Sequence, residues 1–157
     1  MTNRNLAQAP SDRLSLFGYE EDAGRDFPKK SIRLSRTDSL TVSAQIINGG
    51  GETNMHSHTG EDEAWIVLSG RARFYGMNTD AEGGEEVVGE LGPREGIMIP
   101  KGVPYWFESA SGDQLEVLRV SSIDKSVKSE RVNYQPLKGW QMEHGLGGRD
   151  ATAADRS

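Results

Sequence analysis

The chain of 157 residues contains no cysteine and only three histidines, His56, His58 and His144. Without thiols there are no disulfides and no thiolate metal sites, so any metal must be held by nitrogen and oxygen ligands. Hydrophobic residues make up 34% of the sequence and the mean hydropathy is -0.64. Values this low indicate that part of the length is polar tail rather than packed core.

The sequence also lacks the features of membrane and nucleic-acid-binding proteins. No apolar stretch approaches the length of a membrane span, and the opening MTNRNLAQAPSDRL has no apolar run of the kind found in secretion signals. The 18 Lys and Arg against 24 Asp and Glu give a net charge of -6, which repels a phosphate backbone and an anionic membrane alike. We therefore expect a cytoplasmic protein with neither nucleic acid nor membrane as a partner.

Short apolar or alternating runs fill the sequence from residue 31 to residue 122. They include SLTVSAQII, AWIVLSGRARFYG and LEVLRVS, and Gly-Gly, Gly-Pro and Ser-Gly turn signals separate them. About seven strands with a turn roughly every ten residues favour a closed or sandwiched antiparallel β fold. The sequence predicts one domain: an N-terminal arm over 1–30, a β-barrel over 31–122 and a C-terminal extension over 123–157 with a disordered end.

Two histidines and a carboxylate form the candidate metal site. His56 and His58 are one residue apart, so on an extended strand both imidazoles leave the same face. The acidic cluster 61–63 follows a Thr-Gly turn signal, which lets the chain reverse and bring a carboxylate opposite the histidines. Two imidazoles and one carboxylate with open positions are typical of non-haem Fe(II) sites. A lone His-x-His with nearby acidic residues is usually a solvated turn, so spacing alone leaves metal binding open.

The segment GGETNMHSHTGEDEAWIVLSG resembles the first signature motif of the cupin superfamily. Gly50, His56, His58, Glu63 and Gly70 stand at the motif's intervals, which select Glu63 over its acidic neighbours. The segment REGIMIPKGVPYWFES resembles the second motif, and the likeness spans about residues 40 to 120. It implies an all-β, single-domain cupin, a double-stranded β-helix or jelly-roll barrel. It also implies one divalent transition metal bound inside the barrel by the two histidines and the glutamate.

Three positions depart from the second motif. Arg94 stands in place of its first glycine, and Ser109 in place of its asparagine. Tyr105 stands where the family usually carries a third histidine ligand. A phenol binds a hard metal once it is deprotonated, and a metal lowers its pKa from about 10. Tyr105 is therefore a candidate metal ligand, a candidate acid–base group, or simply an aromatic wall of the pocket.

Strand alternation indicates which side chains line the barrel interior. Trp65 shares a face with Glu63, Phe107 shares one with Tyr105, and Arg119 lies on the last strand of the barrel. We expect an aromatic substrate pocket with little charge beyond the metal and Arg119, which would anchor a carboxylate or enolate. Plain core packing of the two aromatic residues and solvent exposure of Arg119 are the alternatives.

These features predict a metal-dependent enzyme that acts on a small organic substrate, aromatic or enolisable, with Glu63 and Tyr105 as catalytic residues. The first hypothesis is a non-haem Fe(II) dioxygenase, although the ligands also suit Mn, Ni, Zn, Co or Cu. The second is a lyase, isomerase or cyclase that uses the metal without O2, which the missing third histidine favours. The third is a non-catalytic small-molecule-binding cupin, against which the intact first motif argues.

Two further expectations concern the ends of the chain. The arm and the strand from Ser31 to Arg36 have apolar residues and an open strand edge, which predict a homodimer. His144 lies in the C-terminal extension near Trp140, where a mobile tail is poorly suited to hold a ligand. We therefore expect His144 to be exposed and to play no part in metal binding.

Overall fold

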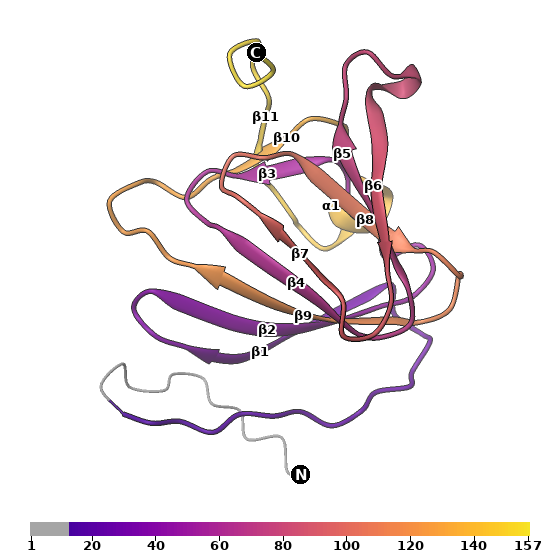
Figure 1. Cartoon of the computed structure of the whole chain (residues 1–157), viewed down its shortest axis with the longest axis vertical. Helices are drawn as coiled ribbons and strands as arrows, with labels where there is room; N and C mark the ends of the chain where they lie inside the picture. The colour runs from indigo at the N-terminus through magenta and orange to yellow at the C-terminus, as the bar shows by residue number, and fades with distance from the viewer. Residues whose placement is uncertain (1–12) are drawn as a thin grey trace.

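The structure, a computed structural model, describes residues 13–157 and is nearly all β (Figure 1). Its strands form two sheets, one in the order β1-β2-β9-β4-β7 and the other in the order β11-β10-β3-β8-β5-β6. The strands are β1 (Lys29–Arg36), β2 (Leu40–Ile47), β3 (His56–His58), β4 (Glu63–Ser69), β5 (Ala72–Met77), β6 (Glu85–Leu91), β7 (Gly96–Ile99), β8 (Tyr105–Ser109), β9 (Leu115–Ser122), β10 (Arg131–Asn133) and β11 (Arg149–Asp150). The expected all-β, double-stranded β-helix fold is confirmed.

Two short helical segments accompany the sheets. A 3-10 turn, η1 (Glu82–Gly84), closes the β5–β6 hairpin, and the helix α1 (Gly139–Glu143) follows β10. None of the helices in the described part of the chain is long and apolar enough to cross a membrane.

The core lies between the inner faces of the two sheets, where alternate residues of each strand are buried. In β4 the pattern places Glu63, Trp65 and Val67 inside, and in β8 it places Tyr105 and Phe107 inside. Period-two burial is what a strand with one buried face produces. The same pattern that fills the core therefore aims polar side chains of β4 and β8 into the interior.

Register across the barrel fixes which residues meet. In the six-stranded sheet His56 is paired with Tyr105 on one side, and His58 is paired with Arg131 on the other. In the five-stranded sheet Trp65 is paired with Arg119. Directly paired residues project from the same face of a sheet, so the histidines share the interior with side chains of both neighbouring strands.

The two ends of the chain run outside the central strands. Residues 1–12 of the predicted arm lie outside the described residues, and residues 13–28 run without regular structure past β1 (Figure 1). Leu14, Leu16 and Phe17 are exposed there, and the homodimer stays a prediction. At the other end β10, α1 and β11 fall within residues 123–157, and β10 adds to the sheet beside β3. Disorder of the last residues also stays a prediction.

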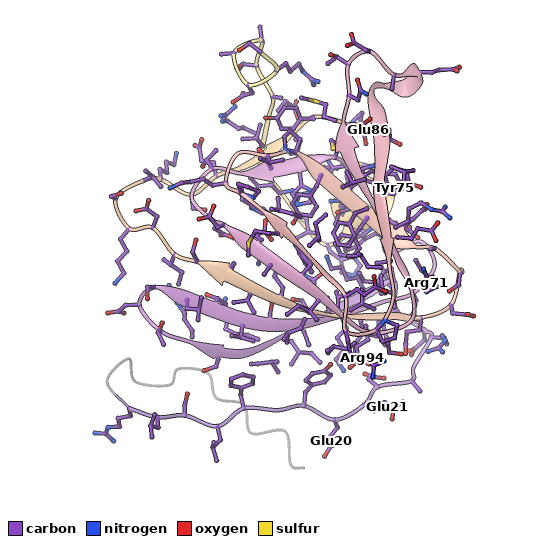
Figure 2. All side chains as sticks on the ribbon, viewed as in Figure 1. Glu20, Glu21, Arg71, Tyr75, Glu86 and Arg94 are labelled. Carbon is purple, nitrogen blue, oxygen red and sulfur yellow. The ribbon has the colours of Figure 1, made fainter. Side chains whose placement is uncertain are left out.

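Arg94 adopts a backbone conformation that favours glycine. It has φ of 73° and is the third residue of a turn in which the Glu95 N–H donates to the Gly92 carbonyl at 3.0 Å (Figure 2). With Pro93 in second place, this is the arrangement of a type II turn, whose third residue needs positive φ. Steric strain at positive φ therefore explains why the family motif has glycine at this position. Arg94 adopts the same turn, at a cost in folding stability of about 1 kcal/mol.

We expect Arg94→Gly to raise the free energy of unfolding by about 0.5 to 1 kcal/mol, because the relief of backbone strain outweighs the added flexibility of the unfolded chain. Urea unfolding measures the change. Arg94→Ala is the matched control, since it removes the same side chain but keeps the strained φ. A glycine variant no more stable than the alanine variant would contradict the explanation.

Candidate metal centre

The candidate metal ligands converge from both sheets. His56 and His58 come from β3, Glu63 begins β4, and Tyr105 begins β8. His56, Glu63 and Tyr105 are buried, while His58 is partly buried. The ring centres of His56 and His58 are 5.1 Å apart, and those of His56 and Tyr105 are 4.8 Å apart. The four residues predicted from the sequence therefore lie together in the barrel interior.

A network behind His56 sets the orientation of its ring. His56 Nδ1 lies 2.8 Å from the Asn54 carbonyl oxygen and donates to it, which leaves Nε2 as an acceptor for a metal. Asn54 is held in turn by Gln141 of α1, whose Oε1 accepts from the Asn54 N–H at 3.2 Å and whose Nε2 donates to Asn54 Oδ1 at 3.1 Å. Both Asn54 and Gln141 are buried. The ring position thus depends on a helix far away in the sequence.

Both histidines are in the neutral form at pH 7. Burial, followed by the Arg131 charge, holds the pKa of His56 well below its usual 6.5. Burial, followed by the Arg119 charge, lowers the pKa of His58 to about 4. Neutral imidazole is the form that binds a metal, so neither ligand has to lose a proton first.

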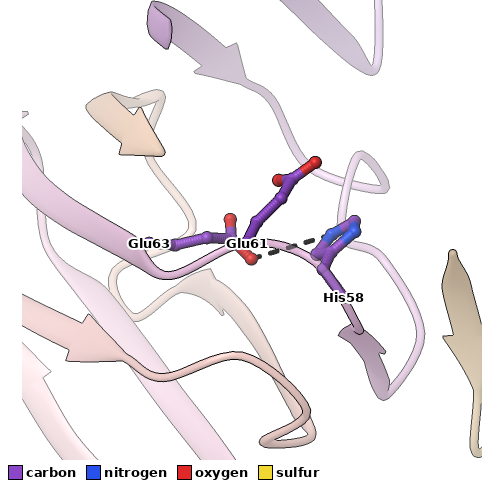
Figure 3. A group of neighbouring side chains, drawn as sticks. All are labelled: His58, Glu61 and Glu63. Atoms are coloured by element: carbon purple, nitrogen blue, oxygen red, sulfur yellow. Dashed lines mark ion pairs between the residues drawn. The ribbon is translucent and has the colours of Figure 1, made fainter. Parts of the chain in front are cut away.

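Carboxylate oxygens of two residues lie near His58. The donor atoms of His58, Glu61 and Glu63 all lie within 4.8 Å of one another, and His58 Nε2 is 3.7 Å from Glu63 Oε1 (Figure 3). Glu61 was not a predicted ligand, because the motif interval selects Glu63 alone. The only signal in the sequence was the run of three acidic residues to which both belong.

The Glu63 carboxylate is fully partnered within the barrel. Tyr105 Oη lies 3.1 Å from each Glu63 oxygen, and Arg119 Nε donates to Glu63 Oε2 at 2.6 Å. Arg119 also reaches Glu61 Oε2 through Nη2 at 2.5 Å. Burial and the Glu63 charge raise the pKa of Tyr105 well above 10, so Tyr105 stays protonated and its O–H donates a hydrogen bond to the Glu63 carboxylate.

The donor set fits a divalent transition metal. The group within 4.8 Å offers the His58 imidazole and the Glu61 and Glu63 carboxylates, on the adjoining strand and loop, and does not include His56. His56 lies beside it, with its ring centre 5.1 Å from that of His58 and its ring fixed by Asn54. Arg119 competes for Glu63 Oε2, but Glu63 Oε1 faces His58 and accepts only from Tyr105. One oxygen of Glu63 thus remains suited to a metal shared with His58.

A cavity of about 140 Å³ opens beside these ligands and is lined by both histidines and Tyr105. The predicted pocket residues Trp65, Phe107 and Arg119 also line it, and their role in binding stays a prediction. The two aromatic rings belong to the hydrophobic core as well, with centroids 5.0 Å apart.

The cavity is more highly charged than the sequence indicated. Lys29 and Arg131 line it in addition to Arg119, so the expectation of little charge beyond the metal and one arginine is wrong. Lys29 begins β1, and β10 places Arg131 directly opposite His58. Both lie in segments that the sequence assigned to an arm and a tail, and no local pattern placed them at the site.

Comparison with known proteins identifies the family. The cupin domain family matches residues 43–121, so the chain belongs to the cupins. A sequence comparison with curated proteins finds no match. Among solved structures, a cupin superfamily protein from Desulfitobacterium hafniense is 17% identical with a TM-score of 0.54, covering 66% of this chain and 84% of its own.

Two enzymes are also structurally similar. A sugar phosphate isomerase of the cupin superfamily from Silicibacter pomeroyi is 16% identical with a TM-score of 0.56, covering 69% of this chain and 67% of its own. An oxalate oxidase is 12% identical with a TM-score of 0.53, covering 67% of this chain and 56% of its own. At such identities these likenesses establish the fold alone.

Lys29 provides a stability test of the cavity's charge. Burial, followed by the Arg131 charge, lowers the Lys29 pKa from 10.5 to about 7. Between these pH values the unfolded chain holds a proton that the folded chain does not, so folding is penalised increasingly as the pH falls from about 10.5 to 7. Below pH 7 the penalty is constant.

We expect Lys29→Met to be more stable than the wild type by on the order of 2 to 4 kcal/mol at pH 7, with the difference vanishing near pH 10.5. Chemical unfolding at several pH values measures it. Lys30→Met is the control, because Lys30 is exposed and paired with Asp22 at 2.7 Å. A Lys29→Met effect that does not change with pH would show that Lys29 is not desolvated.

Proposed function

We propose that this cupin is a metal-dependent enzyme acting on a small organic substrate. The observation that carries the proposal is the group of His58, Glu61 and Glu63, whose ligand atoms lie within 4.8 Å of one another, together with the fixed His56 ring 5.1 Å from that of His58. A ring held this firmly by a buried network is suited to a metal ligand, because pre-positioned ligands bind metals more tightly. The adjoining cavity provides room for a substrate beside that site.

The first candidate reaction is that of a non-haem Fe(II) dioxygenase. The two-histidine, one-carboxylate donor set is the arrangement associated with such sites, and it supports iron over the other divalent metals that the ligands accept. When bound, the metal would supply a Lewis acid for a substrate oxygen and, as Fe(II), the electrons for O2 activation. Trp65 and Phe107 would exclude water from the substrate, since both are buried in the cavity wall.

The second candidate is a non-oxidative lyase, isomerase or cyclase. The protonated Tyr105 phenol beside the Glu63 carboxylate favours it, because this pair can hold a proton at Oη and accept one at a carboxylate oxygen. Oxygen consumption separates the two candidates: uptake of O2 with substrate turnover supports the dioxygenase, whereas turnover under strict anaerobic conditions supports the second.

We expect His56→Ala, His58→Ala and Glu63→Gln each to lose most of the bound metal, because each removes one of only a few ligands. Elemental analysis of protein purified without chelators, together with titration of Fe(II) and Mn(II), measures this loss. His144→Ala is the matched control, since His144 is exposed and its Nδ1 lies 2.8 Å from the Trp140 carbonyl oxygen. Equal metal content in all four variants would contradict the proposed function.

We expect Tyr105→Phe to fold normally and to lose turnover. The change removes one hydroxyl and keeps the ring, so the free energy of unfolding should fall by about 1 kcal/mol or less. Loss of a proton-transfer group should lower the turnover rate by about 10² to 10⁴. Metal analysis of the same variant distinguishes a ligand from an acid–base group. Wild-type metal content together with wild-type turnover would leave Tyr105 as a cavity wall.

A further inference from the structure

Three cations surround the cavity, and no carboxylate side chain lines it. Lys29 comes from β1, Arg119 from β9 and Arg131 from β10. Arg119 is neutralised by Glu63 and Glu61, at 2.6 and 2.5 Å. Neither Lys29 nor Arg131 forms an ion pair with any carboxylate in the described part of the chain. The chain thus directs two basic side chains, neither of them in an ion pair with a carboxylate, toward a partly enclosed space.

Such charges are costly unless a ligand offsets them. Cations removed from water lose hydration free energy, and the loss persists where no anion is nearby. Lys29 and Arg131 are both partly buried, and this burial lowers the pKa of Lys29 to about 7 and that of Arg131 to about 10. A protein that lacked a use for these charges would gain stability by replacing them with apolar residues.

An unpaired buried donor also belongs to a residue of the cavity wall. Among the described residues few buried side-chain nitrogen or oxygen atoms have no hydrogen-bond partner, and Arg131 Nε is one of them. Arg131 lines the cavity. A buried donor without an acceptor is rare in native proteins.

The position of Arg131 connects the charges to the metal centre. Arg131 is paired with His58 across β10 and β3, so both project to the same face. Its Nη2 donates to Asn54 Oδ1, which holds the guanidinium in place and leaves Nε unpaired. A fixed guanidinium edge is suited to a planar carboxylate. A cavity of about 140 Å³ admits a molecule of roughly benzene's size.

We propose that the substrate is a small organic acid whose carboxylate is bound by Lys29 and Arg131. The role of the acid as a substrate rests on the proposed function. Binding of an anion does not, because it is inferred from the residues that line the cavity. Both residues lie outside residues 43–121, the part that matches the cupin domain. The acid specificity is therefore built from the chain's own flanking strands and does not follow from the shared cupin motif.

Calorimetric titration with acetate, glycolate and malonate at about pH 6, where Lys29 is protonated, tests the proposal at constant ionic strength in chloride. We expect these acids to bind the wild type, and Lys29→Met and Arg131→Met each to weaken binding at least about tenfold, since each removes one of two charges that the carboxylate meets. Lys30→Met and Arg149→Met, which remove exposed cations paired elsewhere, should change the affinity less than about twofold. Arg131→Lys keeps the charge without the planar fork and serves if Arg131→Met fails to fold; we expect an intermediate loss.

Acetamide and inorganic phosphate separate the ligand classes. Acetamide, which has the shape of acetate without its charge, should bind at least about tenfold more weakly than acetate if charge recognition dominates. Equal binding of acetamide and acetate, or wild-type affinity in both methionine variants, would overturn the proposal. Binding of phosphate in place of every carboxylate would also overturn it, because the site would then serve a phosphoryl group.

Repeating the titrations after chelator treatment keeps this proposal apart from the proposed function. Carboxylate binding that persists without metal and still depends on Lys29 supports the anion site. This holds even if the His56→Ala variant keeps its metal and so contradicts the proposed metal-dependent enzyme. Normal metal content combined with carboxylate affinities unaffected by Lys29→Met and Arg131→Met contradicts the anion site and leaves the metal enzyme standing.

Discussion

The buried Glu63 carboxylate is the constraint on which the rest of the site depends. Its side chain is 1% exposed, so its charge must be compensated inside the barrel. Arg119 and Tyr105 supply that compensation, and they join β9 and β8 to β4 across the two sheets. The position of Arg119, and with it that of Glu61, follows from satisfying this single charge. Trp65 and Phe107 lie on the same inner face as Glu63 and Tyr105, because side chains two residues apart on a strand project to the same side.

Two cations in the same cavity lack the kind of partner that Glu63 has. Lys29 and Arg131 are partly buried without a carboxylate partner, which is the reverse of the situation at Glu63. The candidate metal ligands and the two cations of the proposed anion site therefore line one cavity. Glu63 has hydrogen-bond partners within the barrel, whereas neither cation forms an ion pair with a carboxylate of the described residues, and the Glu63 charge favours their protonated forms only from a distance. This division is typical of sites in which stability has been exchanged for binding.

Much of this architecture could be predicted from the sequence because it is locally encoded. The alternation around Glu63 and Tyr105 reports which side chains share a buried face, and the His-x-His spacing reports two imidazoles on one side of a strand. Lys29 and Arg131 could not be found this way. Their places depend on which distant strands pair, in particular on β10 lying beside β3. At Arg94 the sequence showed that the glycine of the motif was missing but not why a glycine is usual there. The positive φ of Arg94 gives the reason.

The buried Gln141 gives the short helix α1 a role beyond covering the barrel. It holds Asn54, and Asn54 holds the His56 ring, so detaching the helix frees the imidazole to rotate. If a metal binds His56, docking of α1 and binding of the metal are coupled, and each favours the other by the same coupling free energy. A five-residue helix near the end of the chain would thus influence binding at a residue some eighty positions earlier in the sequence.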